Sequence, residues 1–186
     1  MSVSDEQLML AYGAGDAAAF ETLYGRHKGP LFGFVVRSVK TRGEAEEIFQ
    51  DVWMRAIEAR ERYQPAAKFT TWLYTIAHHR LIDHWRVKGL AVVPLDTGDD
   101  DEGPALDPAA GPDADPHEIA VAVQTRDRFA AALAALPLVQ REAFLLHAEG
   151  GLTVPEIAAA TATNEEAAKS RLRYAMKKLR EAIEDE

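Results

Sequence analysis

The sequence predicts an all-α protein in which two small helical domains are joined by a flexible acidic linker. Apolar residues recur at spacings of three and four on both sides of residues 90–116, and strand-like alternation is absent. Capping residues precede several of these periodic stretches. Residues 90–116 are rich in Pro, Gly and Asp, a composition that buries too little apolar surface to offset the entropy of ordering.

The first domain is expected over residues 1–89 as a helical bundle. Ser4, Asp16 and Thr41 are predicted to cap three of its helices, and two of the three have capping-box spacing. The periodic apolar residues, which form the expected core, are Leu8, Leu10, Tyr12, Phe20, Leu23, Tyr24, Leu31, Phe34, Val35, Val39, Ile48, Val52, Ile57, Phe69, Leu73, Ile76 and Leu81.

The linker is expected over residues 90–116. Residues 91–118 hold 9 of the 30 acidic side chains and none of the 21 Lys and Arg side chains. The whole formal charge of −9 therefore arises there, and both nearly neutral flanks can carry local basic faces. A flexible chain of this length has a relaxed span of roughly 30 Å and a fully extended reach of about 90 Å.

The second domain is expected over residues 117–186. Asp115 and Pro116 are the predicted N-cap and first-turn proline of a helix that continues over 119–136, and Pro137 ends it. Another helix is expected over 138–149, where two glycines follow.

A helix-turn-helix is expected at the end of this domain. Thr153 and Glu156 have the spacing of a capping box for a short helix that ends near Ala160. A polar break precedes a final helix over 165–183, and the second helix of such a motif enters the major groove. One face of this helix is basic through Lys169, Arg173, Lys177 and Arg180. A solvated charged face is the alternative interpretation.

Residues 68–86 interleave aromatic and basic side chains on one expected helix. Such a pattern favours an interface where unstacked bases lie against aromatic rings and phosphates meet positive charge. Trp72, Tyr74 and Trp85 are the candidate stacking rings, and burial of these rings in the core is the alternative.

Several classes of function are not expected. The chain has no cysteine, and His78, His79 and His84 lack the i, i+4 spacing that directs two imidazoles at one metal ion. The sequence has no phosphate-binding glycine loop and no nucleophile elbow. We therefore expect that the protein is not an enzyme and that it binds no cofactor and no small-molecule substrate. No stretch reaches the roughly 18 apolar residues of a membrane span, and residues 1–7 carry acids where a signal peptide is basic, so we expect a cytoplasmic protein without membrane insertion.

Three segments in one order carry a family resemblance. They are AEEIFQDVWMRAIEA at 45–59, FTTWLYTIAHHRLIDHWR at 69–86, and a longer segment at 136–180 that contains GLTVPEIAAATATNEEAAKSRLR. Together they resemble the extracytoplasmic-function (ECF) sigma factors of the sigma-70 family. The resemblance implies that residues 1–89 are sigma region 2, that 117–186 are sigma region 4, and that the partners are core RNA polymerase, promoter DNA and an anti-sigma factor.

The resemblance also implies site residues. Those matching the polymerase-binding helix are Glu46, Glu47, Ile48, Gln50, Asp51 and Arg55. Those matching the surface for the minus-ten element are Lys68, Phe69, Trp72, His79, Arg80 and Arg86, with the loop 61–67 as the pocket for a flipped base. Those matching the minus-thirty-five reader are Asn164, Glu165, Lys169, Ser170, Arg171, Arg173, Tyr174 and Lys177. This chain departs from the family pattern at four positions. The family usually has Asn where this chain has His79, and Gly followed by an aliphatic residue where it has Ala162 and Thr163. A larger aliphatic residue is usual where this chain has Ala168.

The linker and the overall function each leave an alternative. The acidic linker is expected to pass through a basic polymerase channel that otherwise holds RNA, or to act only as a solubilising spacer. A stand-alone helix-turn-helix regulator that binds operator DNA without polymerase, and an adaptor that binds polymerase without giving a transcript, are the alternative functions. The net acidity of the chain disfavours the regulator.

Overall fold

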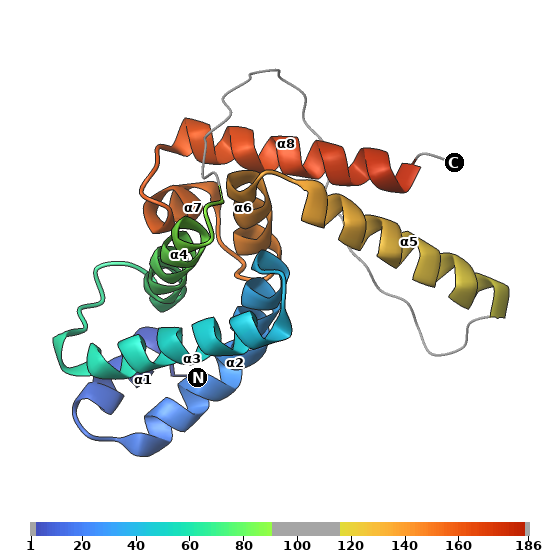
Figure 1. Ribbon diagram of the computed structural model, residues 1–186. Coiled ribbons are helices and arrows are strands. Elements are labelled where there is room, and N and C mark those ends of the chain that lie inside the picture. The colour runs from blue at the N-terminus through green and yellow to red at the C-terminus, as the bar shows by residue number, and fades with distance from the viewer. Residues whose placement is uncertain (1–2, 91–115, 185–186) are drawn as a thin grey trace.

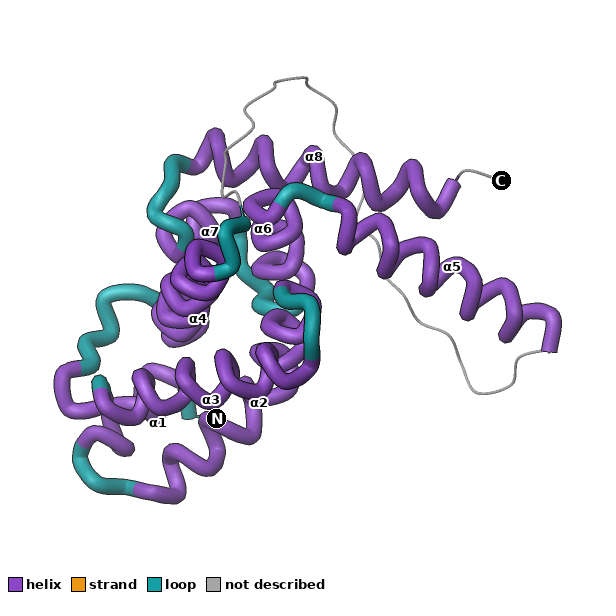
Figure 2. Tube along the Cα trace, in the orientation of Figure 1, coloured by secondary structure: helices purple, strands orange, loops and turns teal. Residues whose placement is uncertain are grey.

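The computed structural model describes residues 3–90 and 116–184, with side chains from 122 onward in the second range. The expected linker residues 91–115, including the predicted N-cap Asp115, lie outside the described residues. Within the described ranges the chain forms α-helices and one short 3-10 helix but no strand, which confirms the predicted all-α class (Figures 1 and 2).

The helices are α1 (Asp5–Gly13), α2 (Ala17–Ser38), α3 (Arg42–Glu58), η1 (Arg60–Arg62), α4 (Phe69–Val87), α5 (Pro116–Ala135), α6 (Leu138–Ala148), α7 (Val154–Ala160) and α8 (Glu165–Glu184).

The first three helix starts follow local capping chemistry. The Ser4 side chain accepts the Gln7 N–H in a capping box that begins α1, and Thr41 does the same for Glu44 at α3. The carboxylate of Asp16 accepts two backbone N–H groups at the start of α2, at 3.0 and 3.3 Å. All three predicted N-caps are therefore confirmed.

Helices α1–α4 surround one apolar core. Contacts join α1 to α2, α2 to α3 and α3 to α4, and fully buried side chains come from all four helices, Met9 being the one from α1. They include Leu23, Leu31, Phe34, Ile48, Phe69, Leu73, Leu81 and Trp85. The indole N–H of Trp85 donates to the Ser38 carbonyl at 3.2 Å and so connects α4 to the end of α2.

Helices α5–α8 pack mainly through contacts of α8 with α5, α6 and α7 (Figure 1). Helix α5 begins at Pro116, the residue predicted for its first turn, because proline is compatible with that position. At its other end the Arg141 guanidinium donates to the carbonyls of Ala134 and Leu136. These bonds satisfy carbonyl groups that the end of α5 leaves without helical partners.

The short helix α7 and the long helix α8 form the predicted helix-turn-helix. Thr153 and Glu156 make the predicted capping box. In the turn, Ala162 has a φ of 51°, the left-handed conformation for which glycine is the ordinary residue. The turn therefore keeps a left-handed residue although the sequence has alanine there.

The two helical groups are in contact. Helix α4 packs against α7, and α2 packs against α6, so residues 3–90 and 116–184 meet over two pairs of helices (Figure 1). None of the helices in the described ranges is long and apolar enough to cross a membrane.

Candidate nucleic-acid interface

The exposed face of α3 carries most of the residues predicted to bind polymerase. Glu46, Glu47, Gln50 and Arg55 are exposed, whereas Ile48 is only 1% exposed. Ile48 therefore anchors α3 in the core, and the polar residues beside it form a surface with three carboxylates, that of Asp51 included.

Arg80 connects that surface to α4. Its Nε donates to Asp51 Oδ2 at 2.6 Å and its Nη2 to Glu47 Oε1 at 3.3 Å, and its side chain is only 14% exposed. The family resemblance implies that Arg80 belongs to the minus-ten surface and that both acids belong to the polymerase surface. The structure brings these two sets together through one guanidinium.

The start of α4 holds an aromatic cluster. Phe69 is fully buried, with its ring centroid 5.2 Å from that of His27, 6.3 Å from that of Tyr63 and 5.7 Å from that of Trp72. Burial raises the pKa of the Tyr63 hydroxyl to about 12, and the nearby acidic side chains on α1 add to the shift. Lys68, directly before this cluster, is exposed.

The candidate stacking rings differ in accessibility. Trp72 is partly exposed, but Tyr74 and Trp85 are 2% and 1% exposed and belong to the core. Their aromatic faces are covered by protein in this structure, which agrees with the alternative interpretation for these two rings. His79 and Arg86, also predicted for DNA contact, are exposed on the same helix.

Helix α8 separates a packing face from a polar face. Ala168, Leu172, Ala175 and Leu179 are buried, which confirms that one stripe packs. The predicted reading residues Glu165, Lys169 and Lys177 are exposed, and Ser170, Arg171, Arg173 and Tyr174 are partly buried. Asn164 has a capping role, because its Oδ1 accepts the Ala167 N–H at 2.7 Å.

Sequence reasoning missed the polar contacts between the two helical groups. His78 Nδ1 of α4 lies 2.6 Å from Glu142 Oε1 of α6, and both side chains are buried. Lys68 Nζ, just before α4, lies 2.8 Å from Glu156 Oε1 of α7. These partners are 64 and 88 residues apart in the sequence, so no local spacing indicates them.

A third contact joins α2 to the end of α6. Arg37 Nη1 lies 2.7 Å from Glu149 Oε1, and Gly33 leaves space for this pair. The hydrogen bond between exposed Lys68 and the largely covered Glu156 raises the pKa of the Lys68 ammonium and lowers that of the Glu156 carboxyl.

No group of His, Cys, Asp and Glu side chains in the described part of the chain has the arrangement of a metal site.

Two family models match the chain, Sigma-70 region 2 over residues 23–90 and Sigma-70 region 4 over 126–179. The ECF RNA polymerase sigma factor SigK of Mycobacterium tuberculosis (strain ATCC 25618 / H37Rv) is 32% identical over 97% of this chain and 95% of its own length. The chain belongs to the ECF sigma factors. RNA polymerase sigma factor CarQ of Myxococcus xanthus is 30% identical over 91% of both chains.

Solved structures agree with this sigma factor in fold. CnrH, solved in complex with the cytosolic domain of CnrY, has a TM-score of 0.69 at 22% identity and covers 98% of this chain and 99% of its own. RpoE of Bartonella quintana, solved with the anti-sigma factor NepR, has a TM-score of 0.65 at 22% identity and covers 90% and 98%. The family assignment made from the three sequence segments is confirmed.

Proposed function

We propose that this sigma factor binds core RNA polymerase through α3, holds the unpaired minus-ten strand with the loop 61–67 and α4, and reads the minus-thirty-five element with α7 and α8. It makes and breaks no covalent bond and acts in the cytoplasm. The carrying observation is that one chain holds a region 2 match followed by a region 4 match. A stand-alone regulator would need only the helix-turn-helix of the region 4 match.

The polymerase-binding role of α3 rests on its division into two faces. Ile48 is buried while Glu46, Glu47, Gln50 and Arg55 are accessible to a partner. The Arg80 contacts with Glu47 and Asp51 connect this surface to α4. Polymerase bound at α3 therefore also fixes the orientation of the helix proposed to hold the unpaired strand.

The minus-ten role rests on the start of α4. Exposed Lys68 and partly exposed Trp72 lie next to the loop 61–67, and exposed His79 and Arg86 lie farther along the same helix. Lys68 and Arg86 supply positive charge, and Trp72 supplies an aromatic ring. Charge of this kind binds phosphates, and aromatic faces stack on unpaired bases. The duplex is opened by capture of a strand, and no chemical step is needed.

The minus-thirty-five role rests on α8. Its buried stripe packs against α5, α6 and α7, which leaves Lys169 and Lys177 on the polar face. In a helix-turn-helix the N-terminal part of the second helix lies nearest the base edges, and later basic residues lie nearest phosphates.

The contacts between the two helical groups must open in this function. Two promoter elements about 20 base pairs apart lie roughly 70 Å from each other at about 3.4 Å per pair. Domains joined by the His78–Glu142 and Lys68–Glu156 contacts cannot occupy both elements at once. We propose that residues 1–89 and 117–186 are separate domains, that polymerase holds them apart, and that the linker 90–116 spans them, passing through a basic channel or serving as a spacer.

An anti-sigma factor is the proposed inhibitory partner. RpoE of Bartonella quintana, similar in fold, was solved with one. A partner that binds both helical groups while they are in contact would keep the minus-ten and minus-thirty-five surfaces at an unproductive separation.

Transcription with purified core polymerase on genomic DNA fragments of the source organism tests the proposal. Adding the sigma factor should give transcripts whose mapped 5′ ends share two upstream sequence elements. Binding to the same fragments without core would indicate a stand-alone regulator. Binding to core without any transcript would indicate an adaptor.

A further inference from the structure

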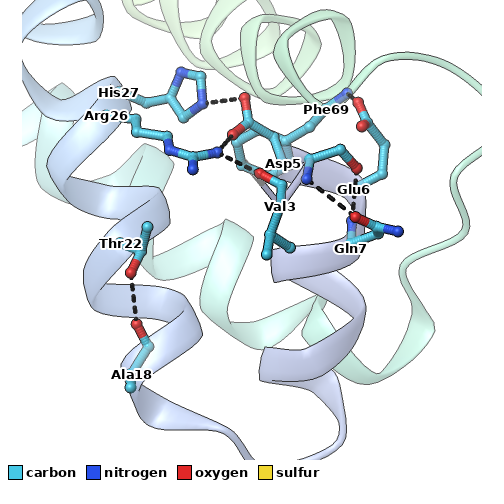
Figure 3. Close-up of polar contacts among 10 residues, drawn as sticks. Val3, Asp5, Glu6, Gln7, Ala18, Thr22, Arg26, His27 and Phe69 are labelled. Carbon is cyan, nitrogen blue, oxygen red and sulfur yellow. Dashed lines mark hydrogen bonds and ion pairs between the residues drawn. The ribbon is translucent and has the colours of Figure 1, made fainter. Parts of the chain in front are cut away.

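Helix α4 is capped from another part of the chain. The first N–H groups of a helix have no partner within it, and Lys68 at the N-cap supplies no side-chain hydrogen bond. Instead Glu6 Oε1 accepts the Phe69 N–H at 2.8 Å across 63 residues of sequence (Figure 3). A carboxylate at a helix N-terminus also interacts favourably with the helix dipole.

The position of Glu6 is itself fixed. It lies in the first turn of α1, between the two residues of the Ser4–Gln7 capping box. The neighbouring Asp5 is 2.7 Å from Arg26 Nη1 and 2.7 Å from His27 Nε2, both on α2 (Figure 3). The acceptor for α4 is thus held by two other helices.

Phe69 has a second contact with the residues around Glu6, through its side chain. The His27 ring, held by Asp5, contacts the ring of Phe69 at a centroid distance of 5.2 Å. Hydrogen bonding from the Phe69 N–H lowers the pKa of the Glu6 carboxyl, so the ionised form is the acceptor. Both the backbone and the side chain of Phe69 are therefore fixed from α1 and α2.

Phe69, which Glu6 holds, is the first residue of α4 and follows the loop 61–67 by two positions in the sequence. Lys68 precedes it, and Trp72 follows one turn later on the same helix. Helix α1 lies outside the region 2 match, which begins at residue 23. Nothing in that match accounts for a carboxylate at this point.

We propose that Glu6 is a positioning residue for the minus-ten strand: its carboxylate holds the first turn of α4 and thereby the loop 61–67 and Lys68 in the geometry that receives an unpaired base. The inference rests on the proposed function of α4. Glu6 need not touch DNA for this role.

Holoenzyme made with Glu6→Ala, Glu6→Gln or Asp16→Ala tests it on a single-stranded minus-ten oligonucleotide. Asp16→Ala is the matched control, because it removes a carboxylate cap from α2, away from α4. Loss of a cap that acts on the binding geometry should weaken oligonucleotide binding about fivefold for Glu6→Ala, less for Glu6→Gln, which keeps an acceptor, and not for Asp16→Ala. Affinity for core should be unchanged in all three.

Hydrogen exchange supplies a readout for each folded variant. The amides at the start of α4 should exchange faster in Glu6→Ala than in wild type or Asp16→Ala. Equal oligonucleotide binding by Glu6→Ala and Asp16→Ala, or a parallel loss of core affinity, would overturn the inference. If wild-type holoenzyme bound no minus-ten strand, the proposed function of α4 would fail instead.

Discussion

His78 on α4 and Glu142 on α6 form a buried polar pair between the two helical groups, with 2.6 Å between Nδ1 and Oε1. Their side chains are 11% and 2% exposed. Removing one member of a buried pair leaves the other without compensation, whereas removing both is less costly.

Variants of this pair should shift the protein toward a separated state. In the closed state the two helical groups are in contact, and in the open state they are separated. We expect His78→Ala and Glu142→Ala each to lower the ratio of closed to open molecules about tenfold or more. In the double variant, the loss of free energy of closing should be smaller than the sum of the losses in the two single variants. Because the chain has no cysteine, Glu21→Cys and Glu184→Cys permit specific dye labelling for single-molecule energy transfer. His79→Ala is the control, and an effect equal to that of His78→Ala would contradict the assignment.

A substitution at Gly33 gives a second test of the contact between the two helical groups. A Cβ there would lie 2.8 Å from Glu149 Oε2 and 3.0 Å from Arg37 Nη1, so Gly33→Ala should disturb that ion pair and lower the closed fraction. Gly25 on the same helix has no atom within 4 Å of its Cβ position, and Gly25→Ala should stabilise the fold by up to about 1 kcal/mol without opening it. Energy transfer and urea denaturation measure the two effects. Identical behaviour of the two variants would argue against close packing at Gly33.

Ala162 gives a prediction about stability. Its φ of 51° is unfavourable for an L-residue with a Cβ, so Ala162→Gly should raise the free energy of unfolding by about 1 kcal/mol. Ala159→Gly, in the exposed part of α7, should lower it by about 1 kcal/mol because glycine is a poor helix former. Thermal denaturation followed by circular dichroism compares them. A lower melting temperature for Ala162→Gly would show that this turn is unstrained.

Glu44 gives a prediction about pH. Its hydrogen bond with Lys88, with help from the Thr41 cap, lowers the pKa of this carboxyl from 4.5 to about 2. A depressed carboxyl pKa stabilises the fold above the unfolded-state pKa, and the contribution is lost as pH falls from 4.5 toward 2. Glu44→Gln should therefore reduce the acid dependence of the unfolding free energy in that range, measured by urea titration. The same change at exposed Glu58 should have less effect, and equal slopes for Glu44→Gln and wild type would contradict the pKa shift.

The secondary structure was largely predictable because its determinants are local. Ser4, Asp16, Thr41 and Thr153 each cap a helix through groups two or three residues away, so spacing alone identifies them. The buried stripe of α8 likewise follows from its period.

The polar contacts between distant segments were not predictable. Glu6 reaches Phe69, and His78 reaches Glu142, only after the helices have packed. The interleaved aromatic residues of α4 did not indicate which rings are accessible, since Trp85 is buried while Trp72 is partly exposed on the same helix. The polymerase and promoter contacts remain predictions, because they depend on partners that change which surfaces are covered.

Separation of the two helical groups by polymerase is the central requirement of this account. Energy transfer between dyes at positions 21 and 184, in free protein and after addition of purified core, measures it directly. The account predicts high transfer in the free protein and a single shift to low transfer in the holoenzyme that initiates transcription. An active holoenzyme with the transfer efficiency of the free protein would contradict it.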